Sequence, residues 1–398
     1  MQYDEAKRLA GSADVEARRA LAARDDVAPE ILFFLCRDAD AGVRRAVAGN
    51  LHAPREADLE LARDPEDSVR ARVGQKLGAA RPVDLPQLSA KKQALTIETI
   101  ETLAVDTSGR VRAAIALALK QSIDAPPHVV QQLARDIEIK VASPILRNSP
   151  MLGDADLVDI MNSGPIKGVL NAIAKRRNVS QSVTELLVNR AIATPGEESA
   201  VADLLTNETA RIGAGTMTKI IDVAPEHGDW HGALAARRDL TADNLRRVAS
   251  IPSDAIAETM GQRNDLDDAA MTALSHMVAR RMAELTKKRA EEAPVAKPAA
   301  DLFLNSVMKS GKVGPVGAAI SLRAGIPTDV TMKILTSKNP KALLALAWKA
   351  GMSAAQAQSL QTSVGGISAK TALAPTMSGG YPIAHADMEW QLGLYVGH

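Results

Sequence analysis

One short phrase recurs five times within the first 150 residues of the chain. It consists of an aspartate, four further residues, a valine, an arginine and then an alanine-rich segment, and its clearest copies begin at Asp38, Asp64 and Asp106. Weaker copies contain Val15 and Val141, the latter with an alanine in place of the arginine. Repetition at a period of a few tens of residues is typical of stacked helix pairs, in which each unit buries its apolar face against its neighbours. The phrase therefore predicts a helical repeat array.

The fold class follows from this repeat together with the composition. Hydrophobic residues make up 46% of the chain but aromatic residues only 2%, so the core must be built mainly from Ala, Leu, Val and Ile. These side chains suit close packing between helices. The aspartate and the arginine of the phrase are typical of two-helix repeats of HEAT type. We therefore expect an all-α protein: an α–α superhelix, or HEAT-like solenoid, with a smaller C-terminal helical domain.

The spacing of the repeats shows where the array is regular. The repeated valines, at positions 15, 43, 69, 111 and 141, are separated by 28, 26, 42 and 30 residues. The long step contains the proline-bearing segment 81–86, which we interpret as a loop between repeats. A second phrase consists of a polar residue, Val or Leu, a capping residue and then an apolar helix face, and its clearest copies begin at Arg24, Arg177, Arg238 and Arg263. It indicates that the array continues in a divergent form.

These patterns predict four segments along the chain. Residues 1–285 form the repeat array, with regular repeats to about residue 150 and divergent repeats after it. Residues 286–300 are charged at first and then carry two prolines, which is typical of a linker. Residues 301–362 form the C-terminal helical domain, and residues 363–398 form a loop-rich tail.

The tail differs in composition from the rest of the chain. It contains Tyr381, Trp390 and Tyr395, three of the nine aromatic residues, and no Lys or Arg follows residue 370. Residues 388–396 alternate between apolar and other side chains, which favours a strand, and a helix beginning after Asp387 is an equal alternative.

Two roles for the tail stay open. It either caps the terminal helices or docks on another molecule, with Trp390 as the anchor, because Trp is favoured at the centre of interfaces. We expect attachment to the same chain or to a symmetric neighbour, as in a homodimer. The candidate docking residues are Tyr381, Trp390, Leu392 and Tyr395.

The repeated aspartate and arginine are expected to connect neighbouring repeats. In stacked repeats such an aspartate lies in the turn between helices, and such an arginine reaches toward the neighbouring repeat. Recurrent polar residues at a fixed phase are expected at these interfaces, where they satisfy buried backbone groups. We assign this role to Asp38, Asp64, Asp106, Arg44, Arg70 and Arg112.

Four other basic residues are candidates for a binding groove. Arg45, Arg72, Lys140 and Arg147 fall on the second helices of the repeats, which line the concave surface in this class of array. They form either a solvated charged face or a groove for an acidic protein segment. Nucleic acid is the alternative partner, and it is disfavoured because Phe33 and Phe34 are expected in the core and leave few aromatic platforms for bases.

Several short motifs suggest chemistry that their surroundings do not support. Two histidines in the segment 226–231 have the spacing of metal ligands on a helix, but Pro225 and Gly228 favour a turn. The Ser306–Lys309 spacing of acylated serine enzymes stands without its companion motifs. Cys36, the one cysteine, lies in an apolar segment and is expected to be a small buried residue. We therefore expect no catalytic, metal or cofactor-binding residues.

These observations favour a non-catalytic scaffold or regulator that binds protein partners. The net charge of +1 gives no general attraction to nucleic acid or to acidic membranes. The first ten residues include several charged side chains and lack the apolar core of a secretory signal. No apolar run in the sequence reaches the ~20 residues of a membrane span. A cytoplasmic location is therefore expected.

Three segments carry a resemblance to a known family. They are LLTNETARI at residues 204–212, RDL at 238–240 and ALAWKAGM at 345–352. In these segments the chain resembles the bacterial family known as domain of unknown function 2336, and the resemblance covers most of residues 20–362. The resemblance implies a HEAT-like α-solenoid in a bacterial cytoplasmic protein, and it brings no catalytic residues to this chain.

Overall fold

The structure is a computed structural model that describes residues 1–79, 88–291 and 298–396. Its described residues form helices and connecting turns and no strand, so the predicted all-α fold is confirmed. The chain divides into two compact units, residues Met1–Thr216 and Met217–His398. The proline-bearing segment 81–86 and the central part of the expected linker, residues 292–297, lie outside the described residues.

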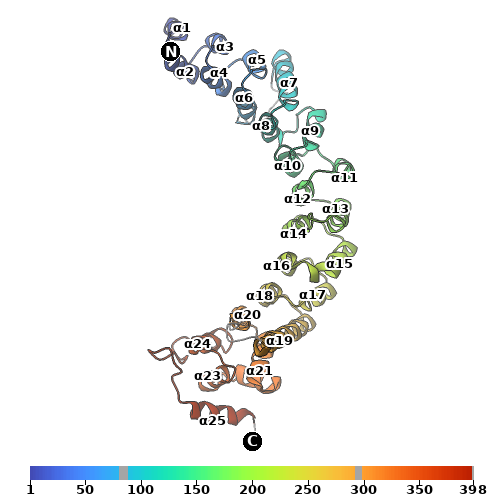
Figure 1. Ribbon diagram of the computed structural model, residues 1–398, viewed down its shortest axis with the longest axis vertical. Coiled ribbons are helices and arrows are strands. Elements are labelled where there is room, and N and C mark those ends of the chain that lie inside the picture. The colour runs from blue at the N-terminus through green and yellow to red at the C-terminus, as the bar shows by residue number, and fades with distance from the viewer. Residues whose placement is uncertain (80–87, 292–297, 397–398) are drawn as a thin grey trace. The chain divides into compact units, whose positions relative to one another are not determined.

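Unit 1 consists of helices arranged in two rows (Figure 1). The even-numbered helices each pack against the next even-numbered helix, and the odd-numbered helices form the second row. Within unit 1 the even-numbered row follows the inner side of the curve in Figure 1. The even-numbered helices are α2 (Val15–Ala22), α4 (Ala41–Gly49), α6 (Asp67–Ala79), α8 (Gly109–Leu119), α10 (Ile139–Asn148), α12 (Val169–Ala174) and α14 (Ser199–Thr206). The odd-numbered helices are α1 (Tyr3–Ala10), α3 (Pro29–Leu35), α5 (Arg55–Leu61), α7 (Ala90–Ala104), α9 (Pro127–Ala134), α11 (Asp154–Asn162) and α13 (Gln181–Ala193).

The helices of unit 1 begin where the sequence places capping residues. The side chains of Asp14, Asp40 and Ser180 each accept a backbone N–H from the first turn of the helix that follows. These bonds satisfy donors that have no partner inside the helix. Pro29 and Pro127 occupy the first helical position, where a missing N–H has no effect on the helix.

The repeated arginines and aspartates join successive repeats. Arg44 donates to both carboxylate oxygens of Asp64 in the next repeat, with Nε to Oδ2 at 2.6 Å and Nη2 to Oδ1 at 3.0 Å. Its Nη1 donates to the carbonyl oxygen of Asp38 in its own repeat, at 2.9 Å. Each guanidinium therefore contacts the turns of two repeats at once, as the sequence predicts. The corresponding carboxylate pairs are Arg18–Asp38, Arg44–Asp64, Arg70–Asp106 and Arg112–Asp136, and we refer to them as the ladder.

The aspartates of the ladder also shape their own turns. In each case one carboxylate oxygen accepts the backbone N–H of the residue two positions later, as Asp64 does from Glu66 at 2.9 Å. The ladder pairs are shielded, with side-chain exposures of 13% for Arg44 and 4% for Asp64. Beyond Asp136 the ladder stops, because Ala142 replaces the arginine and is itself buried.

A second set of hydrogen bonds is formed at the C-terminal ends of the even-numbered helices. The Asn50 side chain donates to the carbonyl oxygens of Ala22 and Arg24, at 2.8 Å and 2.6 Å. Asn207 makes the same pair of bonds to Ala174 and Arg176, at 2.8 Å and 2.7 Å. Both asparagines satisfy the unpaired carbonyls at the end of a helix one repeat earlier.

Among its described residues, unit 2 contains short helices at its start, one long helix of 24 residues, and six further helices after it. Helix α15 (Ala214–Val223) spans the division between the units, and two 3₁₀ turns, η2 (Ala224–Glu226) and η3 (Gly228–Trp230), follow it. The further helices are α16 (His231–Ala236), α17 (Ala242–Ala249), α18 (Asp254–Gly261), α19 (Asp268–Glu291), α20 (Pro298–Lys309), α21 (Val313–Ala324), α22 (Thr328–Thr336), α23 (Pro340–Lys349), α24 (Ala354–Ser363) and α25 (His385–Val396). The boundary expected near residue 285 falls inside unit 2, and it stays a prediction.

The end of the tail is a helix, which decides between the two alternatives that the sequence leaves open. Residues 364–384 carry no helix, and α25 then lies against α22 and α23. Met388 and Leu392, four residues apart, are buried, whereas Trp390, Leu394 and Val396 are exposed. The period-two pattern therefore does not describe one face here, because a helix places residues two apart on different sides.

Candidate functional site

The four predicted groove residues lie on the even-numbered row of unit 1. Arg45 is on α4, Arg72 on α6, and Lys140 and Arg147 on α10, and all four side chains are exposed. Within the described residues Arg45, Arg72 and Arg147 form no ion pair. Lys140 is paired with Glu138, at 2.7 Å from Nζ to Oε2. Three of the four cations are thus available to an external anion.

In the part from α3 to α11, the two rows of unit 1 differ in charge. Helices α4, α6, α8 and α10 carry nine Arg and Lys residues and one acidic residue, Asp67. Helices α3, α5, α7, α9 and α11 carry nine acidic residues and only three Arg or Lys residues. Although the net charge of the chain is only +1, the cations gather on the even-numbered helices and the acidic residues on the odd-numbered helices. The local field of the even-numbered row attracts anions although the whole molecule is nearly neutral.

Four of the nine cations of α4, α6, α8 and α10 have structural roles. Arg44, Arg70 and Arg112 belong to the ladder, and their pKa values are raised by the hydrogen bonds to their aspartate partners. Lys76 forms a buried ion pair with Asp58, and burial lowers the pKa of its ammonium group. The exposed cations that remain are Arg45, Arg72, Arg110, Lys140 and Arg147, and we refer to them as the cationic row.

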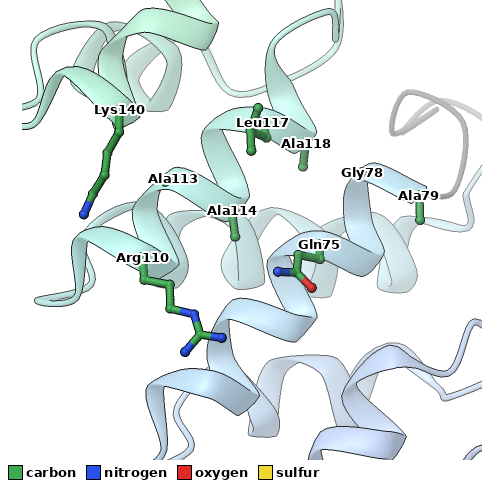
Figure 2. Close-up of a pocket in the computed structure, with 9 residues that line it drawn as sticks. All are labelled: Gln75, Gly78, Ala79, Arg110, Ala113, Ala114, Leu117, Ala118 and Lys140. Carbon is green, nitrogen blue, oxygen red and sulfur yellow. The ribbon is translucent and has the colours of Figure 1, made fainter.

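A pocket of about 540 Å³ opens along this row, between α6, α8 and α10 (Figure 2). It is lined by Gln75, Gly78, Ala79, Arg110, Ala113, Ala114, Leu117, Ala118 and Lys140. Figure 2 shows the Arg110 and Lys140 side chains at one edge and the small side chains of α8 along the pocket. Leu117, the largest apolar side chain of the lining, is 52% exposed. The pocket thus combines two cations with an apolar floor.

Small residues on the two facing helices create this floor. A Cβ atom at Gly78 would lie 2.9 Å from the Cα atom of Ala118, and one at Gly74 would lie 3.2 Å from the backbone nitrogen of Ile115. Helices α6 and α8 therefore approach closely only because α6 has glycine at both positions. The absence of large side chains leaves a hollow next to Arg110 rather than a filled surface.

Of the four predicted groove residues, only Lys140 lines the pocket. Arg45, Arg72 and Arg147 lie along the same row of helices outside it. Sequence reasoning missed Arg110, which lies 3.9 Å from Asp67 and keeps 62% of its side chain exposed. Arg110 directly precedes the repeated Val111, the same place that Lys140 has before Val141, whereas Arg45, Arg72 and Arg147 follow their valines. Its spacing to Ala113, Ala114 and Leu117, which share one helix face, is the signal that would have found it.

The segment 226–231 does not bring its histidines to one site. The His231 ring nitrogen Nε2 bonds the carbonyl oxygen of Ala224 at 2.7 Å, inside the protein. The His227 ring instead stacks on Trp230, with centroids 4.0 Å apart. Nor do the described residues elsewhere gather three or more His, Cys, Asp or Glu side chains that could hold a metal ion.

Two expectations for the first repeats have different outcomes. Cys36 is buried, as predicted, and burial raises the pKa of its thiol to about 12. Phe34 was expected in the core, and this prediction is wrong, because the side chain is 63% exposed. Helix α3 is short and apolar on nearly every side, so part of it necessarily faces outward. Its neighbour Phe33 is half-buried, with the Arg37 guanidinium 5.1 Å from the ring centroid.

The four candidate docking residues of the tail have different environments. Leu392 is buried and Tyr395 is half-buried in α25, whereas Trp390 is 64% exposed. Tyr381 precedes the helix, and its hydroxyl donates to the carbonyl oxygen of Met352 at 2.7 Å. Burial raises the pKa of this hydroxyl to about 12. Tyr381 and Leu392 thus attach the tail to unit 2, and Trp390 alone of the four presents a large exposed surface.

In the part of the chain that the structure describes, no helix is both long enough and apolar enough to cross a membrane.

The fold and the cationic row together define a helical repeat protein with a charged inner surface. The chain belongs to the family called domain of unknown function 2336, described as an uncharacterised protein conserved in bacteria, and the family's sequence model matches residues 141–376. This match confirms the expected family, and it begins at residue 141 rather than near residue 20. A search among curated proteins finds no relative of this chain. Of the cationic row, only Arg147 lies within the matched range.

Proposed function

We infer that the protein is a non-catalytic scaffold or regulator whose cationic row binds an acidic segment of a protein partner. The observation that carries this proposal is the separation of charge between the two rows of unit 1. Three members of the cationic row, Arg45, Arg72 and Arg147, form no ion pair among the described residues, so their charges are available to an external anion. Helices α4, α6, α8 and α10, which carry a single acidic residue, also repel cationic partners, which gives specificity.

The form of the surface favours an extended or helical protein segment. Arrays of stacked repeats bind elongated partners along one row of helices, because each repeat adds a similar contact. The pocket between α6, α8 and α10 adds an apolar site next to Arg110 and Lys140. A partner with carboxylates and one apolar side chain would satisfy both features. We place this binding in the bacterial cytoplasm.

Duplex nucleic acid is the alternative partner, and the cationic row is the observation that favours it. Arginine and lysine side chains along a row can contact successive phosphates. The pocket supports the protein partner instead, because its lining is mostly apolar side chains of Ala and Leu and contains no aromatic residue on which a base could stack.

Fluorescence anisotropy with two labelled probes separates these functions. The probes are a polyglutamate peptide and a DNA duplex, each measured at low and at physiological salt. We expect the triple variant Arg45→Glu, Arg72→Glu, Arg147→Glu to weaken peptide binding by about tenfold or more, which corresponds to ~1.4 kcal/mol. The matched control is Arg63→Glu, Lys91→Glu, Lys92→Glu, which changes the net charge equally but alters the odd-numbered side of unit 1.

The outcomes decide between the two partners. Peptide binding that is lost in the first variant and kept in the control supports the proposal. Equal loss in both variants would mean that only the net charge matters, and this result would overturn it. Duplex binding that is tighter than peptide binding, falls steeply with salt and is lost in the first variant would establish the nucleic-acid function instead.

A further inference from the structure

Helix α25 of unit 2 presents an exposed apolar face. Trp390 and Leu394 lie four residues apart, with exposed fractions of 64% and 60%. Residues at this spacing are neighbours on a helix surface. Tryptophan is the residue type most favoured at the centre of protein interfaces, where it fills a pocket on the partner. This face therefore has the composition of a docking site.

The protein holds this face in place. Met388 and Leu392, on the opposite side of α25, are buried where the helix lies against α22 and α23. The His385 ring lies 5.3 Å from the Trp348 ring, and the Tyr381 hydroxyl donates to Met352. A face that is ordered before binding loses less conformational entropy when a partner docks on it.

The charge of this helix identifies the kind of surface that it fits. Asp387 and Glu389 are exposed on α25, and no Lys or Arg occurs after residue 370. Asp387 lies three residues before Trp390, so a carboxylate stands next to the tryptophan on the same face. The complementary surface has a cavity with an apolar floor and cations at its edge.

We propose that α25 docks, through Trp390 and Leu394, in the pocket between α6, α8 and α10 of a second copy of this chain. The pocket supplies Leu117 and alanine side chains as an apolar floor, with Arg110 and Lys140 at the edge for the carboxylates of α25. The pocket, with a volume of about 540 Å³, is open to solvent, so side chains presented by a helix of another molecule can reach its floor.

This inference rests on the proposed function of the cationic row, and it names one occupant of that row. Each surface is formed within a single unit, and every copy carries both of them. Reciprocal docking between two copies closes a dimer, whereas one-way docking produces open chains of copies. In either case the association strengthens with protein concentration and weakens with salt.

The first experiment measures the mass of the full chain in solution against concentration, by sedimentation equilibrium. We expect association that Trp390→Ala weakens by about tenfold or more, because a central anchor is removed. The matched control is Leu302→Ala, another exposed apolar residue of unit 2, which leaves association unchanged. Because Trp390 is exposed, thermal melting should show that the variant stays folded.

The second experiment exchanges the charges. One variant is Arg110→Glu with Lys140→Glu, and the other is Asp387→Lys with Glu389→Lys. Each alone places like charges in contact and should stay monomeric. Mixed together, they place opposite charges in both contacts and should associate again.

Three results would overturn this inference: a full chain that is monomeric at its highest soluble concentration, association that survives Trp390→Ala, or a charge-exchanged mixture that stays monomeric. Such results leave the proposed function intact if the polyglutamate peptide still binds the cationic row. Loss of peptide binding would instead remove the proposed function, whatever the state of association.

Discussion

Each ladder arginine is fixed by oxygen atoms from two successive repeats. Arg70 donates to both carboxylate oxygens of Asp106 and, through Nη1, to the carbonyl oxygens of Asp64 and Pro65. The planar guanidinium suits this geometry, because its donors lie in a fixed fork that matches a carboxylate. Lysine could make only part of this contact. The recurrence of arginine in the phrase therefore has a stereochemical reason.

Replacing one ladder arginine should lower stability. We expect Arg44→Ala and Arg70→Ala each to lower the free energy of unfolding by about 1–3 kcal/mol, because a shielded carboxylate and a turn carbonyl lose their donors. Chemical denaturation measures the change. The control is Arg63→Ala, whose ion pair with Glu98 is exposed on both sides and should contribute at most ~1 kcal/mol. Equal free energies of unfolding for the wild type and both ladder variants would contradict this role.

The ladder should also make stability depend on pH in the acid range. The hydrogen bond from Arg18 lowers the pKa of Asp38 in the folded protein. A carboxyl group whose folded pKa is depressed stabilises the fold above its unfolded pKa of about 3.9, and this contribution is lost as the pH falls through the folded value.

The measurement compares melting temperatures of the wild type and of Asp38→Asn, which cannot titrate, across the acid range. The advantage of the wild type should be constant from neutral pH down to about pH 5 and should shrink below about pH 4. An advantage that stays constant through this acid range would show that Asp38 carries no stabilising charge.

Helices α6 and α8 show how small residues determine the spacing of elements. Gly74 of α6 is buried, and a Cβ atom there would lie 3.2 Å from the Cβ atom of Ala114. Since glycine within a helix weakens it by about 0.5–1 kcal/mol relative to alanine, two glycines in α6 need a compensating role. Close contact with α8, and the pocket beside it, supply that role.

A larger side chain at this contact should separate the two helices. We expect Gly74→Val to destabilise unit 1 by about 1–3 kcal/mol through overpacking, as measured by denaturation. It should also weaken binding of the polyglutamate peptide, because the pocket changes shape. In contrast, a Cβ atom at Gly232 in α16 would have no neighbouring atom within 4 Å, so Gly232→Ala should leave the free energy of unfolding unchanged or raise it slightly. A Gly74→Val protein as stable as the wild type would show that α6 and α8 are not closely packed.

Comparison of single elements shows why the sequence predicts some features and not others. The ladder was predictable because Asp, Val and Arg recur at one fixed spacing, and each copy repeats the same contacts. The tail was ambiguous, because residues 388–396 satisfy the period of a strand, while Met388 and Leu392 also have helical spacing. Burial against α22 and α23 selects the helix, and these neighbours are distant in sequence from the alternating pattern.

At the scale of the molecule, the sequence predicts stacked helix pairs but not the details of their exposed surfaces. Arg45, Arg72, Lys140 and Arg147 lie on the expected row because the repeat phase assigns them to second helices. The pocket could not be predicted, since it depends on how closely α6 approaches α8. Phe34 is exposed for a similar reason: the orientation of a short apolar helix is set by its neighbours and not by its own pattern.

Charge separation between the two rows, in the part from α3 to α11, is the property of unit 1 on which the account depends. Single ion pairs at the surface contribute little to stability, so the separation has no evident structural benefit. A row of cations instead raises the local concentration of an acidic partner and accelerates its association. The even-numbered helices should therefore be the surface that a partner covers.

Hydrogen–deuterium exchange of the full chain, with and without the polyglutamate peptide, tests this claim most directly. Bound peptide should slow exchange in α4, α6, α8 and α10 and leave α3, α5, α7 and α9 unchanged, and high salt should abolish the difference. Slowed exchange confined to the odd-numbered helices or to unit 2, or no change at saturating peptide, would contradict the assignment of the cationic row as the binding surface.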